Sequence, residues 1–412
     1  MAVFKPFIAF RPKRELAAEV ASKPYDVLSS EEAFKEAEGH PYSFLHIGKP
    51  EIDLPREVDL YDEKVYLKAK ENLDKLVKDG ILIPDEDRYF YLYSLTMDGR
   101  TQDGFVGTAS VEDYWNDVIK KHEKTRKDKE EDRANHIRYT RSHSGPIFLT
   151  FRDDPNLLNI IKQIKIDKPE IDFIASDGVR NQVWVIKDKT LIKAIEQNFG
   201  NTKNLYVADG HHRSAAAAIV GKELKGANPN HNGEEEYNYF LAVAFPASHL
   251  NILDYNRVVK DLNGLTEDEF LKKLSQNFII EEATHQVNPN QKGQFGMYLK
   301  GQWYKLDSKP EILKEADPVE KLDVSIMQKY VLSNILGIED PRTDKRIDFI
   351  GGIRGLGELE RRVNSGEMTV AFAMYPTSID ELLAIADAGK VLPPKSTWFE
   401  PKLRDGLFVH FF

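Results

Sequence analysis

The chain has 412 residues, of which 41% are hydrophobic and 10% aromatic, a composition that predicts roughly two or three globular domains. Its formal net charge of −10 argues against a nucleic-acid or anionic-membrane surface as the main partner, and the absence of cysteine excludes disulfides, thiolate nucleophiles and Cys-ligated metals. Lys5 and Arg11 interrupt any signal-peptide-like apolar region, and no apolar run reaches the length of a membrane span, so we expect a cytoplasmic protein.

Residues 1–106 have the patterns of an accessory α/β unit. Ser29 and Glu32 have the spacing of a capping box, which predicts a helix ending near Glu38. Apolar residues at helical spacing predict a longer helix over Tyr61–Asp79. Four segments have the composition of strands, the last two of them flanking a hairpin turn: Val3–Phe10, Tyr42–Ile47, Tyr89–Thr96 and Thr101–Val106.

A charged stretch follows within residues 107–225. The pair His122-Glu123 precedes the charge-rich run Arg126–Arg133. Arg126 occupies the position where the second histidine of a zinc-protease helix would stand, so the pattern does not indicate a zinc protease. Taken alone, the charge run is typical of a solvated helix face.

The stretch Asn204–Val220 contains the most informative motif. Its composition predicts a strand over Leu205–Ala208, a tight turn at Asp209-Gly210, and an Ala-rich helix that begins near His212. The first N–H groups of a helix lack intrahelical acceptors and carry partial positive charge, so this junction suits an anion.

The side chains at this turn add to the prediction of a phosphate site. Gly210 lets the backbone approach a ligand closely, and Arg213 can bind a phosphate through two hydrogen bonds. His211 and His212 can donate protons or neutralise charge near pH 7, and Asp209 can bind a metal or a hydroxyl group. The alternative is a turn whose polar residues only cap the helix, but four ionisable residues in five consecutive turn residues favour a functional site.

Residues 226–412 are predicted to form a C-terminal α/β domain. Gly226–Glu236 has the composition of a flexible loop, either a lid or an insertion. Thr266 and Glu269 have capping-box spacing, and Asp323–Leu336 has the pattern of an amphipathic helix. Six further segments are predicted to be strands: Tyr237–Phe245, Leu253–Val259, Phe278–Glu282, Gln294–Leu299, Ile347–Ile350 and Val370–Tyr375. Ile379–Ala388 is predicted to be a helix.

Two late motifs carry polar residues in Gly- or Pro-rich loops. Asp340–Arg346 and the following Gly351–Gly355 can hold an anion or form a tight turn, but they lack the order of a P-loop. Lys395, Ser396 and Thr397 lie in a Pro-stiffened loop and can contact a phosphate or a polar substrate; an ordinary surface loop is the alternative.

Several of these motifs carry a resemblance to a known family. The motifs PYDV (24–27), PYSFLHI (41–47), HEKT (122–125), ADGHHR (208–213), DPRTDKRIDFIGG (340–352) and PPKSTWFEPKL (393–403) resemble the family catalogued as domain of unknown function 1015, over nearly the whole chain. From about Val111 onward, the order of the motifs also resembles the free L-serine kinases. That resemblance implies an α+β fold with a ParB/sulfiredoxin-like nucleotide-binding core over residues 107–225, flanked by N-terminal and C-terminal α/β additions.

The resemblance to the serine kinases also implies a reaction and its cofactors. Those enzymes transfer phosphate from ADP or ATP to the hydroxyl of free serine with Mg²⁺. Glu123 matches their catalytic carboxylate, which accepts the proton of the substrate hydroxyl. Asp209 and His211 match further catalytic residues. The nucleotide phosphates are bound in those enzymes by the residues that match Gly210, His211, His212 and Arg213. The substrate is bound by the residues that match Lys395, Ser396 and Thr397.

Three functions therefore compete at this stage. The first is a small-molecule kinase that acts on serine or a related hydroxy compound. The related compounds are included because Trp398 and Phe399 stand where the serine kinases have basic residues. The second is a nucleotide-binding regulator on the same fold without phosphotransfer. The third, a ParB-type DNA-associated protein, is disfavoured by the acidic balance and the absence of an evident basic helix-turn-helix. Sulfiredoxin chemistry is excluded because it needs a cysteine. The sequence indicates neither metal ligands nor the oligomeric state.

Overall fold

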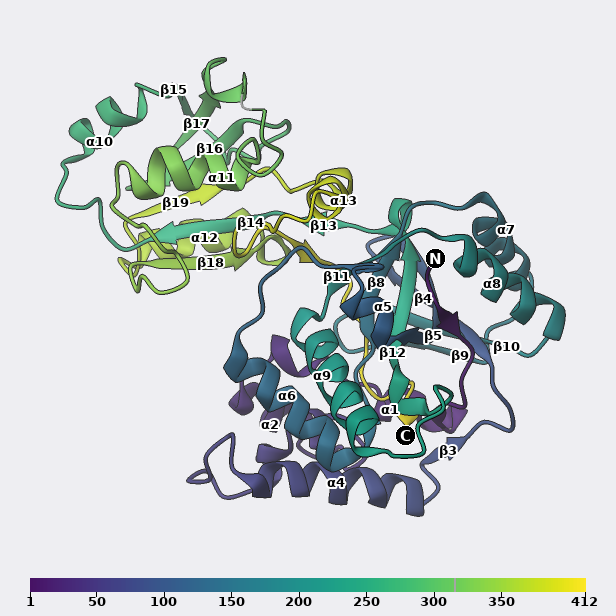
Figure 1. Ribbon diagram of the computed structural model, residues 1–412. Helices are drawn as coiled ribbons and strands as arrows, with labels where there is room; N and C mark the ends of the chain where they lie inside the picture. Colours follow the sequence, from purple (N-terminus) through teal and green to yellow (C-terminus); the bar gives the residue numbers. More distant parts are fainter. Residues whose placement is uncertain (315) are drawn as a thin grey trace. The chain divides into compact units, whose positions relative to one another are not determined.

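The computed structural model describes residues 1–314 and 316–412 (Figure 1). By its internal contacts the chain divides into two compact units, Met1–Leu250 together with Pro401–Phe412, and Asn251–Glu400. The first unit therefore includes a C-terminal segment that follows the whole of the second unit in sequence. The expected segment boundaries at 106/107 and 225/226 fall inside a strand, β5 (Arg100–Ser110), and a helix, α9 (His211–Ala227).

A nine-stranded mixed sheet organises the first unit, in the order β6-β11-β8-β12-β5-β4-β10-β9, with β1 paired to β5. The pairs β11–β6 and β12–β8 are parallel and the other pairs are antiparallel. The strands are β1 (Phe4–Lys5), β4 (Phe90–Met97), β5, β6 (Ile119–Lys120), β8 (Ile147–Phe151), β9 (Ile171–Ile174), β10 (Arg180–Ile186), β11 (Leu205–Asp209) and β12 (Tyr239–Pro246). The architecture is mixed α and β, which confirms the predicted α+β class.

Helices cover this sheet in two groups. The helices α4, α6 and α9 lie side by side, while α7 and α8 lie together over another part of the sheet (Figure 1). Alanines from Ala215 to Ala218 are buried on α9, and their small side chains allow the helix to approach the sheet closely. The remaining bounds are α1 (Ala17–Val20), α2 (Ser30–Ala37), α3 (Leu45–Gly48), α4 (Glu63–Lys78), α5 (Val111–Trp115), α6 (Lys127–Thr140), α7 (Pro155–Ile164) and α8 (Lys189–Asn201).

The N-terminal predictions are confirmed in part. Ser29 and Glu32 form the predicted capping box, in which the Glu32 N–H donates to Ser29 Oγ at 3.2 Å and the Ser29 N–H donates to Glu32 Oε2 at 2.8 Å. The predicted strand Tyr42–Ile47 is wrong, because this segment is a turn that leads into α3. Its apolar side chains are buried against α4, and a short apolar run of this kind is compatible with either a strand or a buried helix.

Two short strand pairs attach the ends of the chain to the first unit. They are β2 (Phe10–Pro12) with β3 (Leu82–Pro84), and β7 (Ser142–His143) with β21 (His410–Phe411). Val409 also exchanges backbone hydrogen bonds with Phe10, at 2.9 Å in both directions. The segment Pro401–Phe412 is thus held along its length by residues from the first part of the chain.

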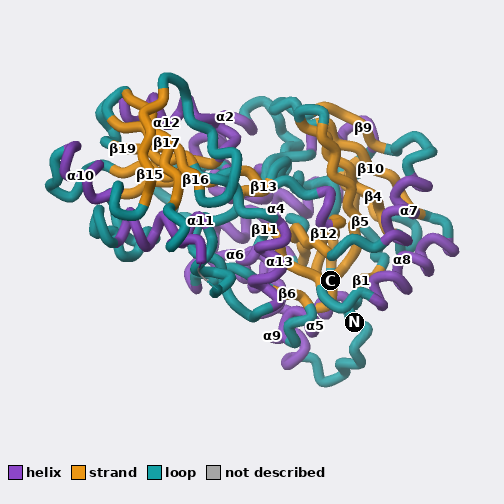
Figure 2. Tube along the Cα trace, turned by 90° about the horizontal axis from the view of Figure 1, so that it is seen from above, coloured by secondary structure: helices purple, strands orange, loops and turns teal. Residues whose placement is uncertain are grey.

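The second unit is built on an antiparallel six-stranded sheet with the order β15-β17-β16-β19-β14-β18, part of which can be followed in Figure 2. Its strands are β14 (Tyr255–Val259), β15 (Phe278–Ala283), β16 (Gln294–Leu299), β17 (Gln302–Ser308), β18 (Ile347–Gly351) and β19 (Val370–Ala373), and a separate pair is formed by β13 (Ile252–Leu253) and β20 (Trp398–Phe399). Its helices are α10 (Glu267–Leu274), α11 (Asp323–Met327), α12 (Gly355–Asn364) and α13 (Ile379–Asp387).

The predicted helix Asp323–Leu336 is present in a modified form. After α11 the chain continues as a π-helix over Gln328–Ser333. The Gln328 amide donates to Ile338 O at 2.8 Å and to Ser333 Oγ at 2.9 Å, which ties this wider turn to the segment that follows it. The capping box of Thr266 and Glu269 is present as predicted.

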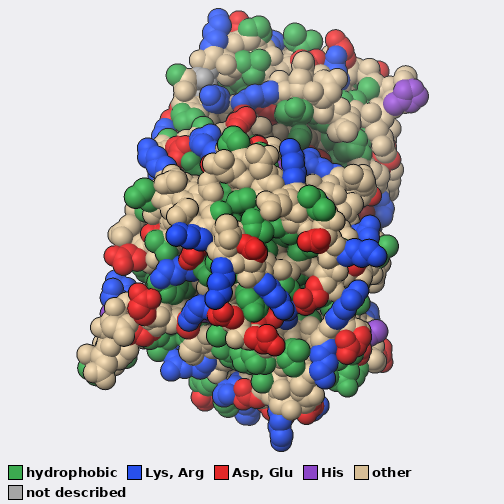
Figure 3. Space-filling model, turned by 90° about the vertical axis from the view of Figure 1, so that its right-hand side faces the viewer, with side chains coloured by type: hydrophobic (Ala, Val, Ile, Leu, Met, Phe, Trp, Pro, Cys, Tyr) green, Lys and Arg blue, Asp and Glu red, His purple; other side chains and the backbone are tan. Residues whose placement is uncertain are grey.

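The surface agrees with the charge balance of the sequence. On the face shown in Figure 3, basic and acidic side chains are interspersed among apolar ones. In the described part of the chain, every helix is too short or too polar to cross a membrane.

The core of the first unit generates a stability prediction. Phe199 on α8 is fully buried, with its ring centroid 4.5 Å from that of Phe4 and 5.3 Å from that of Phe151. Replacing it by alanine removes these contacts and leaves a cavity, so we expect Phe199→Ala to lower the free energy of unfolding by about 3–5 kcal/mol. Urea denaturation measures the change. Ile166→Ala, at a position that is 83% exposed, is the control and should change stability by less than about 0.5 kcal/mol.

Candidate functional site

The predicted strand, turn and helix around Asp209 are present. The strand β11 ends at Asp209, Gly210 adopts a left-handed conformation with φ +89°, and α9 begins at His211. A Cβ atom at Gly210 would lie 3.2 Å from Arg213 Nε, so both the backbone conformation and the space favour glycine here. The Ser214 N–H donates to Gly210 O at 2.9 Å and closes the first turn of α9.

Asp209 is held in its ionised form at the end of β11. Its Oδ1 accepts a hydrogen bond from the Gly210 N–H at 2.7 Å, and its Oδ2 accepts one from Lys402 Nζ at 2.7 Å. Burial alone would raise the pKa of Asp209, but the charges of Lys402 and Arg213 outweigh burial and hold this pKa well below its usual range. The turn therefore carries a permanent negative charge that is matched by Lys402.

Glu123 lies beside His211. The Glu123 Oε2 is 3.7 Å from His211 Nδ1, and the Glu123 side chain is half exposed. The His122 ring packs edge-on against the His211 ring with 4.4 Å between centroids. In the part of the chain that the structure describes, His211 Nε2 and both ring nitrogens of His122 are buried without a hydrogen-bond partner. Buried polar atoms of this kind are typical of ligand and catalytic sites.

The buried histidines differ electrostatically from the prediction. Burial, with a smaller contribution from His212, lowers the pKa of His211 to about 4 even though Asp209 acts in the opposite direction. Burial also holds the pKa of His122 well below its usual value. Both rings are therefore neutral at pH 7, and His211 can donate a hydrogen bond but cannot neutralise charge there.

His212 connects two helices. Its Nε2 accepts a hydrogen bond from the Arg126 N–H at 3.1 Å, at the residue that precedes α6. Burial lowers the pKa of His212. The contact holds the His-Glu segment against the first turn of α9, so His212 also has a structural role.

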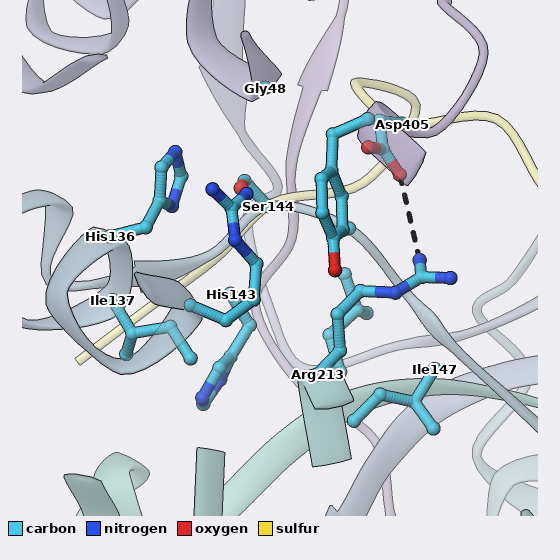
Figure 4. A pocket seen from close by; sticks show the side chains of 12 residues that line it. Gly48, His136, Ile137, His143, Ser144, Ile147, Arg213 and Asp405 are labelled. Carbon is cyan, nitrogen blue, oxygen red and sulfur yellow. Dashed lines mark ion pairs between the residues drawn. The ribbon is translucent and has the colours of Figure 1, made fainter. Parts of the chain in front are cut away.

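Arg213 lies behind the turn, at a small pocket of about 40 Å³. Its Nη1 donates to Pro146 O at 2.9 Å and lies 3.9 Å from Asp405 Oδ1, as the dashed line in Figure 4 marks. Its Nε is buried with no hydrogen-bond partner among the described residues. His143 and Ser144 also face this pocket (Figure 4). The guanidinium is thus partly satisfied by protein groups and keeps capacity for a further acceptor.

A second arginine lines the same pocket. Arg133 on α6 pairs with Asp132 at 2.9 Å, and its guanidinium carbon lies 4.0 Å from the centroid of the Tyr25 ring. The charge run Arg126–Arg133, which we expected to be a solvated helix face, therefore turns its last two residues inward. The Tyr66 hydroxyl donates to Asp132 at 3.0 Å, which further holds this pair in place.

Asp405 has an unusual protonation equilibrium for a carboxyl group beside an arginine. Burial raises its pKa to about 7 and outweighs the opposing effect of Arg213. The residue is placed by two backbone hydrogen bonds with Ser22, 3.0 and 3.1 Å long. Asp405 and Lys402 both reach the site on the segment Pro401–Phe412.

The predicted substrate loop belongs to the second unit. Ser396 is buried, its Oγ donates to Pro393 O at 2.6 Å, and its carbonyl accepts from Thr377 Oγ1 at 3.0 Å. Lys395 has φ +58°, and its Nζ lies 5.5 Å from the centroid of the Tyr255 ring. The structure thus gives these residues local contacts, and the proposed contact of Lys395, Ser396 and Thr397 with a substrate stays a prediction.

A family model matches residues 4–325, well over half of the chain. The chain belongs to the DUF1015 family, described as a protein of unknown function. The resemblance noted from the sequence motifs is confirmed. No curated protein matches this DUF1015 chain.

Solved structures provide distant comparisons for this DUF1015 protein. A free serine kinase variant in complex with AMP shares 14% identity with it, covers 71% of this chain and 89% of its own, and has a TM-score of 0.36. SbnI from Staphylococcus aureus, with a C-terminal truncation, shares 13% identity over 74% of this chain and 87% of its own, with a TM-score of 0.39. A conserved hypothetical protein from Pyrococcus furiosus shares 14% identity over 71% and 92%, with a TM-score of 0.34. These TM-scores are too low to assign a function.

Sequence reasoning about this DUF1015 protein missed the long-range partners of the site. Lys402 lies 193 positions from Asp209 along the chain. Lys402, Tyr25 and His122 stand inside the family motifs PPKSTWFEPKL, PYDV and HEKT, so the motifs themselves were the available signal. Asp405 lies two residues after the motif PPKSTWFEPKL, and no local pattern indicates that it belongs to a site.

The raised pKa of Asp405 predicts a characteristic pH dependence. Between about pH 4 and pH 7 the folded protein keeps a proton that the unfolded chain has lost, so the contribution of Asp405 to stability falls as the pH rises through this window. Asp405→Asn removes this titration. The unfolding free energy of the variant relative to wild type should therefore rise by up to about 1.4 kcal/mol per pH unit across the window.

Urea denaturation of both proteins at several pH values measures this difference. His211 and His136, whose pKa values are lowered to about 4, titrate with the opposite sign, but they do so in both proteins and cancel in the comparison. Asp74→Asn, at an exposed position on α4, is the matched control. A difference that stays constant from pH 4 to pH 7 would contradict the assignment.

Proposed function

We propose that this protein is a small-molecule phosphotransferase that binds a nucleotide at the junction of β11 and α9 and phosphorylates a hydroxyl group. The observation that carries the proposal is the approach of the Glu123 carboxylate to His211, at the N-terminus of a helix that follows a glycine in the left-handed conformation. The resemblance of the His-Glu and Asp-Gly-His-His-Arg motifs to the free L-serine kinases supports the same chemistry, on a ParB/sulfiredoxin-like core.

The phosphate end of the nucleotide would bind at the first turn of α9. The amide groups at the start of a helix lack intrahelical acceptors and favour a phosphate. Gly210 presents no side chain there, and His211 is a neutral hydrogen-bond donor. Because both buried histidines are neutral, the positive charge of the site comes from Lys402 and Arg213.

Glu123 would act as the general base. Its carboxylate accepts the proton of the substrate hydroxyl, the hydroxyl oxygen forms a bond to the transferred phosphorus, and the bond from phosphorus to the leaving nucleotide oxygen breaks. The half-exposed position of Glu123 leaves it accessible to a substrate. Its distance of 3.7 Å from His211 places the base next to the proposed phosphate site.

Mg²⁺ is part of the proposal as the partner of ADP or ATP. The described residues contain no cluster of three His, Cys, Asp or Glu side chains that could hold a metal. Mg²⁺ in nucleotide sites is held largely by phosphate and water oxygens with one or two carboxylates, so a preformed protein cluster is not required. Asp209 is the carboxylate at this junction that would face the ion.

The substrate is proposed as free serine or a related small hydroxy compound. Lys395, Ser396 and Thr397 match the substrate loop of the serine kinases, and Trp398 and Phe399 depart from it. Phosphorus NMR of the protein with Mg²⁺, ADP or ATP, and a pool of amino acids and small hydroxy metabolites tests the reaction. A new phosphomonoester resonance identifies the product; broadened nucleotide resonances without a product indicate a nucleotide-binding regulator.

Glu123→Gln separates catalysis from binding. Removal of the base should lower kcat by about 10²–10⁴-fold and leave the nucleotide dissociation constant unchanged. Steady-state kinetics and calorimetry with ADP or ATP measure the two quantities. Glu112→Gln, at an exposed position on α5, is the matched control and should retain full turnover. Equal turnover in Glu123→Gln and wild type would exclude Glu123 as the base.

Arg213 is predicted to contribute to nucleotide affinity. Arg213→Ala removes a charged donor and should weaken nucleotide binding by about tenfold or more. Because this variant also leaves Asp405 without its cation, Arg213→Lys, which keeps the charge and loses the two-pronged donor, is measured beside it. Arg180→Ala, at an exposed ion pair on β10, is the control. Unchanged affinity in both folded Arg213 variants would contradict the phosphate site.

A further inference from the structure

The second unit contains a larger pocket than the one behind Arg213. Its volume is about 400 Å³, which lies in the range of small-molecule sites. Apolar groups form much of its wall, including Val324, Leu332, Phe349, Pro393 and Pro394. These residues come from α11, the π-helix, β18 and the Pro-rich loop. The pocket lies entirely within Asn251–Glu400.

Arg257 on β14 is a buried charged group in the wall of this pocket. It is only 3% exposed, and its guanidinium carbon lies 5.5 Å from the centroid of the Phe349 ring. Its Nη1 donates to Tyr255 O and its Nη2 donates to Lys395 O at 3.1 Å. A guanidinium has five N–H donors, so three remain after these two carbonyl contacts.

The charge of Arg257 is not neutralised by any carboxylate among the residues that the structure describes. Other buried arginines of the chain are paired: Arg11 contacts Asp85 at 2.7 Å, and Arg404 contacts Asp177. Burial lowers the pKa of Arg257 to about 10, so the group is still cationic at pH 7. A buried charge without a counter-ion is strongly unfavourable, and a bound anion would compensate it.

The acidic groups at the pocket do not provide this compensation. Asp340 accepts two hydrogen bonds from Arg342, at 2.8 and 2.9 Å, so these two residues neutralise each other. Glu339 is exposed and contributes to the mouth of the pocket. Among the described residues that line the pocket, the buried charge is therefore positive.

We propose that this pocket binds a small organic carboxylate whose apolar or aromatic part lies against Phe349 and the prolines. A carboxylate matches the single positive charge, whereas a phosphate dianion would leave one negative charge buried. Its two oxygens match the remaining donors of the Arg257 fork. The motifs DPRTDKRIDFIGG and PPKSTWFEPKL, which contribute to the pocket wall, thereby acquire a binding role. The proposal is independent of phosphotransfer at Asp209.

Isothermal titration calorimetry with three probes tests the ligand class. Phenylacetate carries a carboxylate, phenylacetamide is its neutral analogue, and benzylphosphonate is its dianionic analogue. The full chain should bind phenylacetate saturably and at least about tenfold more tightly than phenylacetamide, the effect of a charge-assisted hydrogen bond. Absence of saturable binding up to about 10 mM phenylacetate would overturn the proposal. Tighter binding of benzylphosphonate would overturn the assignment to carboxylates.

Variants of Arg257 locate the binding. Arg257→Gln should weaken phenylacetate binding by about tenfold or more, and Arg257→Lys should weaken it less because it keeps the charge. Arg342→Gln, at the paired arginine of the same pocket, should bind phenylacetate like wild type. Circular dichroism checks that each variant is folded; if Arg257→Gln is not, Arg257→Lys still decides. Wild-type affinity in a folded Arg257 variant would show that phenylacetate binds elsewhere.

Discussion

The ion pair between Lys402 and Asp209 is the interaction on which the site depends. Asp209 is partly buried at the end of β11, where its charge is stabilised by the Lys402 ammonium at 2.7 Å. The same carboxylate accepts the Gly210 N–H and so shapes the turn into α9. The segment Pro401–Phe412 that carries Lys402 also brings Asp405 to Arg213. The same segment therefore supplies an ionisable partner both to Asp209, before the Gly210 turn, and to Arg213, after it.

The local parts of this site could be predicted from the sequence, because they depend on residues that are neighbours along the chain. Local sequence predicts the glycine turn at Gly210 and the Ala-rich helix that follows it. It also predicts the capping boxes at Ser29 and Thr266. The prediction of a strand over Tyr42–Ile47 is wrong because a short apolar run fits either a buried strand or a buried helix. The role of Lys402 depends on a contact with a residue 193 positions away, which no local pattern encodes.

Burial changes the chemistry that the residue types alone suggest. Histidine usually titrates near neutral pH, but His211 and His122 are buried among groups that keep them neutral. These histidines can therefore contribute hydrogen bonds and packing, and the positive charges near the Gly210 turn are those of Arg213 and Lys402. The two arginines differ in their partners: Arg213 lies 3.9 Å from Asp405, whereas the hydrogen bonds of Arg257 among the described residues go to two carbonyl groups.

The return of the C-terminal segment also affects when the site can exist. During synthesis on the ribosome, Asp209 and the first turn of α9 emerge before any of the second unit, and Lys402 is added only after residues 251–400. Until then the nascent first unit has Asp209 without its cation and Arg213 without Asp405. The ion pairs around the Gly210 turn are thus completed only late in biosynthesis, and a chain that stops short of Lys402 lacks them.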